Sequence, residues 1–171
     1  MKSYVGSLPR WEDERAIRHT MDLYAHAMDY GENEAWRDCF TDDALFLVSD
    51  AQKGYDEIYR VKGDRLLRDY IAAYPRPPAV FAKHVCSQIL VRVEGKTATA
   101  ESFWVAINSE GGGQGSRKPN IMAFGRYKDR LVACPDGRWR FSERICETES
   151  AHWPEPGTYT DRANFSSTTG A

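Results

Sequence analysis

Long apolar runs are missing from this sequence, since none approaches the roughly 20 residues that a membrane-spanning helix requires. The first residues, MKSYVGSLPR, also lack the apolar segment of a secretory signal peptide. An excess of charge of one sign is missing too, because 23 basic and 25 acidic residues give a net charge of −2. Nucleic-acid-binding domains carry basic patches. We therefore expect a cytoplasmic protein that binds neither membranes nor nucleic acid.

Closely spaced cysteine pairs are absent as well. The cysteines, which are far apart and form no C-x-x-C motif, are Cys39, Cys86, Cys134 and Cys146. A structural zinc site normally has paired ligands at short spacing, and cytoplasmic proteins keep their thiols reduced. The sequence therefore predicts free thiols, no metal site and no bound cofactor.

What the sequence does contain is the composition of one globular domain. Of its 171 residues, 42 % are apolar and 12 % are aromatic. Apolar residues recur at helical spacing over residues 10–30, after an acidic first turn, and Gly31 is a natural C-terminal cap. Residues 33–40 predict a short second helix with Asn33 as its N-cap, and a turn at 41–43 is expected to end it.

Further along the chain the apolar period changes from helical spacing to two. Residues 44–50 and 55–61 predict a pair of short strands. Residues 63–74 predict a third helix, which the prolines of 75–78 end. Four long strand candidates follow, over residues 81–95, 96–109, 120–133 and 137–150.

Glycine-containing turns connect these strand candidates. Glu94-Gly95 and Asp136-Gly137 predict tight hairpins, whereas the glycine-rich stretch 111–119 lacks the spacing of a phosphate loop and predicts a plain connection. Helices followed by an antiparallel meander indicate an α+β domain over residues 1–150. We expect the twisted sheet to curl around the helices and to leave a ligand pocket. Residues 151–171 predict a C-terminal tail that covers this pocket or a partner subunit.

Several motifs occur along the chain in a characteristic order. They are Tyr24 and Asp29 near the end of the first helix, W-x-x-x-F-T-D-D-A-x-F at 36–46, Gly63, His84 at the start of a strand, GRY-x-D-R-L at 125–131 and DGRWRF-x-x-R at 136–144. In this order and spacing they resemble the SnoaL-like branch of the nuclear-transport-factor-2-like superfamily. The resemblance covers about residues 12–148.

The resemblance implies a cone-shaped α+β barrel, in which three N-terminal helices pack in a strongly curved, mostly antiparallel sheet. It also implies a homodimer formed through that sheet. The family's enzymes include scytalone dehydratase, bile-acid 7α-dehydratase, hexachlorocyclohexane dehydrochlorinase, steroid isomerases and polyketide cyclases. Most of them use acid–base groups in an apolar pocket, without a metal or an organic cofactor.

Site residues follow from the same resemblance. In the dehydratases and the dehydrochlorinase, an aspartate at the end of the first helix partners a histidine at the start of a later strand, and these roles carry over to Asp29 and His84. A tyrosine five residues before the aspartate of the bile-acid enzyme matches Tyr24. A further aspartate of that enzyme falls near Ala106, where this chain has no acid, although Asn108 lies two residues on. This difference argues against a bile acid as the substrate.

The residues themselves leave the placement of the pair open. A carboxylate that accepts one imidazole N–H fixes the tautomer and leaves the other ring nitrogen as a general base. On a helical wheel, however, Asp29 lies about 140° from the middle of the apolar face, so a solvated Asp29 paired with Arg18 is the alternative. Strict alternation puts His84 and Ile89 on opposite faces of their strand, unless a bulge near Ser87 resets the phase.

We predict a lyase or isomerase that acts on a hydrophobic polycyclic or aromatic hydroxy- or keto-molecule, with His84 as base, Asp29 orienting it and Tyr24 as proton donor. The candidate pocket residues are Met28, Trp104, Asn108 and Phe124. One alternative is a non-catalytic subunit of the same fold, such as the β subunit of a ring-hydroxylating dioxygenase. Another is an epoxide hydrolase or cyclase with inward-facing acids, for which Glu101 and Glu143 are the candidates. The charges of residues 126–130 are expected on solvated or dimer-edge faces.

Overall fold

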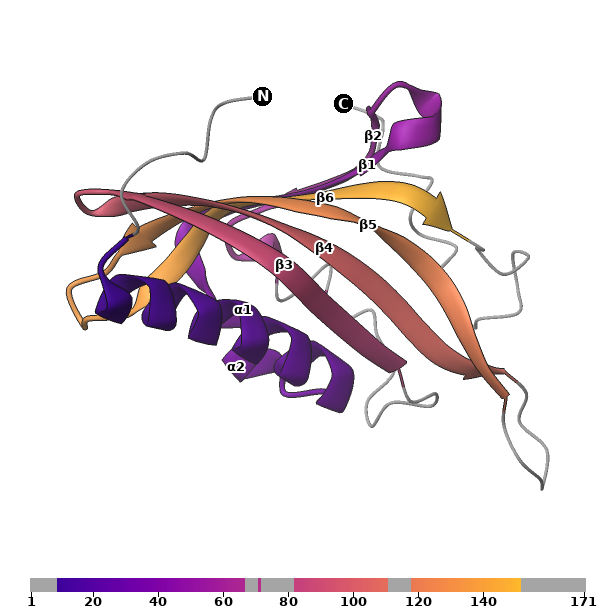
Figure 1. Cartoon of the computed structure of the whole chain (residues 1–171), viewed down its shortest axis with the longest axis horizontal. Helices are drawn as coiled ribbons and strands as arrows, with labels where there is room; N and C mark the ends of the chain where they lie inside the picture. Colours follow the sequence, from indigo (N-terminus) through magenta and orange to yellow (C-terminus); the bar gives the residue numbers. More distant parts are fainter. Residues whose placement is uncertain (1–8, 67–70, 72–81, 111–117, 152–171) are drawn as a thin grey trace.

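The computed structural model describes residues 9–66, 71, 82–110 and 118–151. Its elements are α1 (Trp11–Tyr30), α2 (Asn33–Arg37), β1 (Phe40–Asp50), the 3-10 helix η1 (Ala51–Lys53), β2 (Asp56–Lys62), β3 (Ala82–Glu94), β4 (Thr97–Glu110), β5 (Lys118–Ala133) and β6 (Trp139–Ala151). Figure 1 shows α1 beneath a curved sheet, with β3 as the strand nearest to the helix. The predicted α+β class, with helices before a long meander, is confirmed. We call the side of the sheet that is turned toward α1 the inner face.

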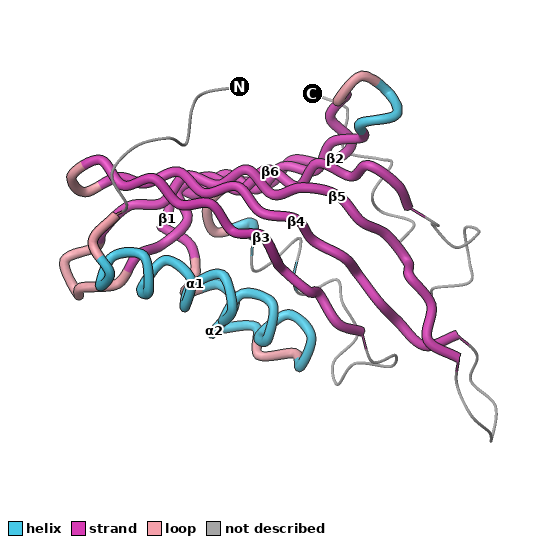
Figure 2. The backbone as a smooth tube through the Cα atoms, viewed as in Figure 1, coloured by secondary structure: helices cyan, strands magenta, loops and turns pink. Residues whose placement is uncertain are grey.

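The strands form one sheet of six, in the order β2-β1-β6-β5-β4-β3. Neighbouring strands are antiparallel except for β1 and β6, which are parallel. Figure 2 shows the long β3, β4 and β5 sweeping together over α1. Gly95 and Gly137 have φ angles of 62° and 81°, a conformation that glycine adopts without a steric penalty. The two predicted hairpins are thus confirmed.

Two details of the second helix were predicted wrongly. The N-cap is Glu32 rather than Asn33, because the carbonyl of Glu32 already accepts the N–H of Trp36 at 2.9 Å. The turn expected at 41–43 lies within β1, since that strand begins as early as Phe40, which is paired with Phe141. The polar residues after Phe40 are accommodated where the β1–β6 register is interrupted, before Leu45.

Several predicted segments lie wholly or mostly outside the described residues. The structure describes two α-helices, α1 and α2, of the three expected. Of the predicted helix at 63–74, Arg65 and Leu66 are helical, and most of the remainder is outside the described ranges. The loop residues 111–117 and the tail residues 152–171 are outside them too. Within the part of the chain that is described, no helix combines the length and the apolar character needed to cross a membrane.

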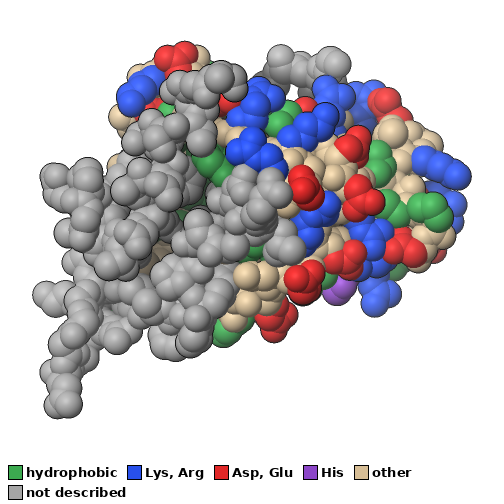
Figure 3. All heavy atoms as spheres, turned by 180° about the vertical axis from the view of Figure 1, so that it is seen from behind, with side chains coloured by type: hydrophobic (Ala, Val, Ile, Leu, Met, Phe, Trp, Pro, Cys, Tyr) green, Lys and Arg blue, Asp and Glu red, His purple; other side chains and the backbone are tan. Residues whose placement is uncertain are grey.

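The core lies between α1 and the inner face of the sheet. Ile17, Met21 and Tyr24 of α1 are at most 1 % exposed. Burial of such side chains stabilises the fold by roughly 1.5–3 kcal/mol each. Thr20 ties the helix to the sheet as well, because its hydroxyl donates to the carbonyl of Trp139 at 2.6 Å. On the outside, Figure 3 shows basic and acidic side chains interspersed over the described part of the rear face.

Candidate functional site

The end of α1 places Asp29 next to the start of β3. Gly31 caps the helix in the left-handed conformation with φ 80°, and its N–H binds the carbonyl of Ala27. The last turn contains no basic residue, and Asp29 is only 7 % exposed. A buried carboxylate at the negative end of a helix dipole requires a hydrogen-bond donor.

β3 supplies this donor because a bulge resets its alternation. Ser87 pairs with Phe103, whereas the next registered pair is Leu90 with Glu101, and Gln88 has a φ angle of 49°. The more buried residues are accordingly the even-numbered ones before the bulge and the odd-numbered ones after it. The bulge expected near Ser87 is confirmed, and His84 shares the inner face with the apolar residues of the second half of β3.

Asp29 and His84 contact each other through two hydrogen bonds. Oδ1 of Asp29 lies 2.6 Å from Nδ1 of His84, and Oδ2 accepts the backbone N–H of His84 at 2.9 Å. The two side chains are 5 % and 15 % exposed, respectively. Arg18, the alternative partner of Asp29, instead binds Glu14 at 2.7 Å and donates to the carbonyl of Ile89 at 3.0 Å.

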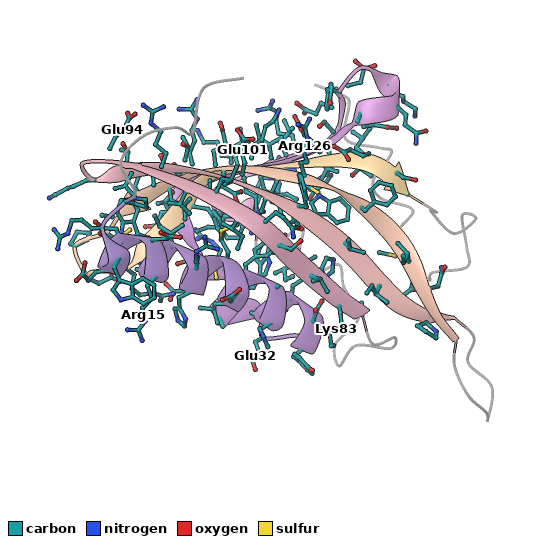
Figure 4. All side chains as sticks on the ribbon, in the orientation of Figure 1. Arg15, Glu32, Lys83, Glu94, Glu101 and Arg126 are labelled. Atoms are coloured by element: carbon teal, nitrogen blue, oxygen red, sulfur yellow. The ribbon has the colours of Figure 1, made fainter. Side chains whose placement is uncertain are left out.

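This contact defines the chemistry that the imidazole can perform. An ionised carboxylate can only accept, so the contact is a hydrogen bond when Nδ1 carries the proton, and in the neutral ring this puts the lone pair on Nε2. Nε2 makes no hydrogen bond to any residue that the structure describes. Next to the pair, the ammonium group of Lys83 lies 4.5 Å from the ring centroid of Tyr30, and Figure 4 shows Lys83 where β3 starts beside the end of α1. Such an arrangement would allow the imidazole to act as an oriented general base.

Three of the four predicted pocket residues lie near this pair. In the β3–β4 register His84 pairs with Ala106, and the flanking inner pairs are Ala82 with Asn108 and Cys86 with Trp104. Directly paired residues of antiparallel strands point to the same side of a sheet. Trp104 and Asn108 therefore share the inner face with His84, and Met28 directly precedes Asp29 in α1 and is 4 % exposed.

Phe124 was predicted to line the pocket, but the structure places it on the opposite face. It pairs with Val105 and is 45 % exposed. The reason is a second bulge: Ala106 pairs with Ala123 but Ile107 pairs with Ile121, so Met122 is the extra residue. A strict period of two through Met122 and Phe124 therefore assigns Phe124 to the wrong face.

Tyr24 lies in the aromatic core rather than in the Asp29–His84 contact. Its ring is 1 % exposed and packs edge-on against the rings of Phe40 and Phe141. The guanidinium carbon of Arg144 lies 4.0 Å from its centroid. A cation at this distance from an aromatic face is attracted by the ring quadrupole.

Arg144 forms a completely buried ion pair that the sequence reasoning missed. Its Nε lies 3.3 Å from Oδ1 of Asp129, and both side chains are 0 % exposed. Burial raises the pKa of the Asp129 carboxyl to about 7, although the Arg144 cation acts in the opposite direction. Asp129 was expected on a solvated or dimer-edge face, which is wrong. Its alternation with buried Tyr127 and Leu131 was the available indication.

The acids that an epoxide hydrolase or cyclase would need on the inner face point elsewhere. Glu101 pairs in register with Leu90, which is 49 % exposed, and Figure 4 shows Glu101 on the side of the sheet away from α1. Glu143 forms an ion pair with the exposed Arg130 at 3.2 Å. Among the described residues no group of three or more His, Cys, Asp or Glu side chains is arranged to hold a metal ion, and the four cysteines are free thiols.

Comparison with known proteins identifies the family. Residues 9–145 match the SnoaL-like domain. No curated protein matches the sequence. Among solved structures, the Mycobacterium tuberculosis protein Rv3472, of unknown function, is similar with a TM-score of 0.68 and 26 % identity over 84 % of this chain and 78 % of that one.

Two further structures come from Novosphingobium aromaticivorans. The β subunit of a candidate aromatic-ring-hydroxylating dioxygenase gives a TM-score of 0.69 at 22 % identity, over 82 % of this chain and 91 % of that one. A candidate scytalone dehydratase gives a TM-score of 0.59 at 25 % identity, over 81 % and 85 %. The dioxygenase subunit therefore shows the fold alone.

Proposed function

The chain belongs to the SnoaL-like family, and on that premise we propose that it is a cofactor-independent lyase or isomerase with His84 as its base. The observation that carries the proposal is the buried contact between Asp29 and His84, which leaves Nε2 of the imidazole unoccupied by any described residue. The family contains dehydratases and isomerases, and a candidate scytalone dehydratase has the same fold.

The proposed reaction begins with proton transfer from carbon. Nε2 of His84 takes a proton from a carbon next to a carbonyl group, and Asp29 stabilises the imidazolium that forms, through its bond to Nδ1. The electron pair of the broken C–H bond then forms a C=C bond. In an elimination, a hydroxyl group on the neighbouring carbon leaves as water with a proton from Tyr24, after which the imidazolium releases its proton to solvent and the tyrosinate takes one up. In an isomerisation, the imidazolium returns its proton to another carbon.

The surroundings of the pair favour a hydrophobic substrate. Met28, Trp104 and the small side chain of Ala106 share its neighbourhood, and each is at most 4 % exposed. Asn108 is the polar residue of this set, and its Nδ2 lies 3.6 Å from Sδ of Met122. We propose that a polycyclic or aromatic hydroxy- or keto-molecule binds at this part of the inner face.

Deuterium exchange tests the base without knowledge of the natural substrate. The wild-type protein is incubated in D₂O with 1-tetralone and with a panel of bicyclic β-hydroxy ketones, and ¹H NMR follows exchange next to the carbonyl and loss of water. We expect the H84A variant to lose the protein-catalysed rate by about 10²–10⁴-fold, the usual contribution of a positioned base. His26 is an exposed histidine of α1, so H26A is the matched control and is expected to keep the rate.

A subunit without catalytic activity is the second candidate function. It is favoured by the fold shared with the dioxygenase β subunit. Exchange rates that are equal in wild type and H84A, together with co-purification of an iron–sulfur subunit from the native source, would establish this alternative and exclude the enzyme.

We also propose that the outer face of the sheet binds a second copy of the chain. Val85, Phe103 and Phe124 are 46 %, 53 % and 45 % exposed. They lie on the adjacent strands β3, β4 and β5 and point away from α1, as their register partners indicate. A contiguous exposed apolar surface of this kind marks an interaction site, and one patch shared by two copies gives an isologous dimer.

A further inference from the structure

We infer that the indole N–H of Trp104 donates a hydrogen bond to the ligand that binds beside His84. The substrates would then carry a carbonyl or hydroxyl oxygen on the ring system that accepts this hydrogen bond. This inference rests on the proposed function, because it takes the inner face around His84 as the ligand site. It adds a residue that selects for an acceptor oxygen.

The primary observation is a buried donor that lacks an acceptor. Trp104 is 4 % exposed, and its Nε1 is shielded from solvent without a hydrogen bond to any atom of the described residues. Buried indole N–H groups usually have a partner. Leaving a buried donor unpaired costs about 1–3 kcal/mol, and a ligand oxygen at this position would recover that free energy.

The position of Trp104 in the sheet supports the assignment. It pairs with Cys86 in the row next to the one formed by His84 and Ala106. On the other side of β4, Ala106 pairs with Ala123 and Trp104 pairs with Gly125. In the row of His84, β4 and β5 therefore carry only the methyl groups of Ala106 and Ala123, and no large side chain of that row separates the imidazole from the indole.

The indole ring is also held in place, so it cannot easily turn toward another acceptor. It stacks on the ring of Tyr127, with centroids 5.7 Å apart and an interplanar angle of 29°. The guanidinium carbon of Arg144 in turn lies 3.8 Å from the Tyr127 centroid. A donor that packing fixes before the ligand arrives loses little conformational entropy on binding.

Ser102 is the competing donor on the same strand. Its hydroxyl is buried, and it too has no hydrogen-bond partner among the described residues. However, it lies two residues further along β4, which places it about 7 Å farther from the row of His84. Ser102 therefore provides a matched control for the assignment to Trp104.

Paired probes test the inference through binding alone. 1-Tetralone and tetralin share a bicyclic skeleton and differ in one acceptor oxygen, and calorimetry or NMR titration gives the affinity of the purified full-length protein for each. The ratio of the two affinities, compared between variants, cancels the difference in hydration of the probes. We expect Trp104→Phe, which keeps an aromatic ring on Tyr127, to lower the ratio by about tenfold, the factor that corresponds to one hydrogen bond of roughly 1.4 kcal/mol.

Each outcome either supports or overturns the assignment. The Ser102→Ala variant is expected to keep the wild-type ratio within about twofold, and a loss in that variant instead would assign the donor to Ser102. An unchanged ratio in Trp104→Phe, or a wild-type protein that binds neither probe, would overturn the inference. The His84→Ala variant separates it from the proposed function: a protein that lacks catalysis but retains the tetralone preference keeps the Trp104 site and loses the His84 chemistry.

Discussion

The carboxylate of Asp29 holds His84 at two points, because Oδ1 lies 2.6 Å from Nδ1 of the ring and Oδ2 accepts the backbone N–H at 2.9 Å. One side chain thus fixes both the orientation of the imidazole and the position at which β3 begins. The donors of His84 also satisfy a carboxylate that the C-terminal end of α1 disfavours. The same contact therefore contributes to stability and to the proposed chemistry.

Replacement of Asp29 by Asn should lower the stability of the fold and disturb the orientation of the His84 imidazole. An amide has a single acceptor atom, so it cannot accept from Nδ1–H and from the backbone N–H in the same geometry. We expect the free energy of unfolding to fall by about 1.5–3 kcal/mol, the usual value for hydrogen bonds to a charged group. Urea denaturation measures this change, and ¹⁵N NMR of the imidazole should show that the wild-type proton is on Nδ1 and that the variant loses this preference.

Asp22 offers the matched control for this experiment. It is an exposed carboxylate of the same helix, so Asp22→Asn should leave the stability within about 0.5 kcal/mol of wild type and the imidazole spectrum unchanged. A wild-type His84 with its proton on Nε2 would contradict the orientation of the base described here.

Substitution and deletion of Gln88 test whether the bulge in β3 brings His84 to the inner face. Its φ angle of 49° is costly for a residue with a side chain, so Gln88→Gly should keep the bulge and leave the stability equal or higher by up to about 1 kcal/mol. Deletion of Gln88 removes the extra residue and therefore turns either His84 or Ile89 away from α1. We expect the deletion to lower the melting temperature and to abolish the Nδ1 proton signal of His84. A deletion variant that retains this signal would show that the bulge is not required.

Much of the fold could be predicted from periodicity. The features that could not be predicted in this way depend on single residues. The strands, their hairpins and the helix cap follow from patterns that extend over many residues. The placement of His84 and Phe124 depends on one extra residue in β3 and one in β5, which reverse the alternation without a distinctive sequence. The contact of Asp29 with β3 depends on where two distant segments meet, and a helical wheel contains no information about that.

The burial of Asp129 and Arg144 is a second feature that could not be predicted from either residue's local sequence. Alternation with Tyr127 and Leu131 places Asp129 on the inner face, but a charged residue is ordinarily assigned to the surface. Its partner is 15 residues away on the neighbouring strand, where Asp129 pairs with Arg144 in register. The β5–β6 register, and not either residue alone, explains the burial of both charges.

A Tyr24→Phe variant distinguishes the role of the Tyr24 ring from the role of its hydroxyl group. The ring packs among Phe40, Phe141 and the Arg144 guanidinium, and phenylalanine preserves these contacts. We expect Tyr24→Phe to change the free energy of unfolding by no more than about 1.5 kcal/mol, the typical loss of one hydrogen bond. If the hydroxyl is the proton donor, loss of water from β-hydroxy ketones should slow at least tenfold while α-deuterium exchange continues. Equal losses in both reactions would argue against a donor role.

Phe103 tests the outer face of the sheet as a dimer surface. Because its side chain is 53 % exposed, Phe103→Glu should leave the fold intact and place a charge against the same patch of the second copy. We expect sedimentation equilibrium to show a dimer for wild type and a monomer for the variant. Ile58, which is 38 % exposed on β2 at the far end of the sheet order, gives the control Ile58→Glu, expected to remain dimeric. A wild-type monomer at micromolar concentration would exclude the proposed dimer.

Asp129 makes the stability of the protein depend on pH in an unusual direction. Burial raises its pKa from 3.8 to about 7 in the folded state, so between these values the folded chain retains a proton that the unfolded chain releases. Stability should therefore fall as the pH rises from about 4 to about 7, by up to about 1.4 kcal/mol per pH unit, and should depend little on this group above that range. Urea denaturation at intervals of half a pH unit measures the slope.

The Asp129→Asn variant cannot titrate at this position and should remove this contribution to the slope. It should also be less stable at neutral pH, because Arg144 loses its buried partner. Asp22→Asn should keep the wild-type slope. If wild type and Asp129→Asn have the same slope, Asp129 is ionised throughout this range and the Arg144 cation outweighs the cost of burial.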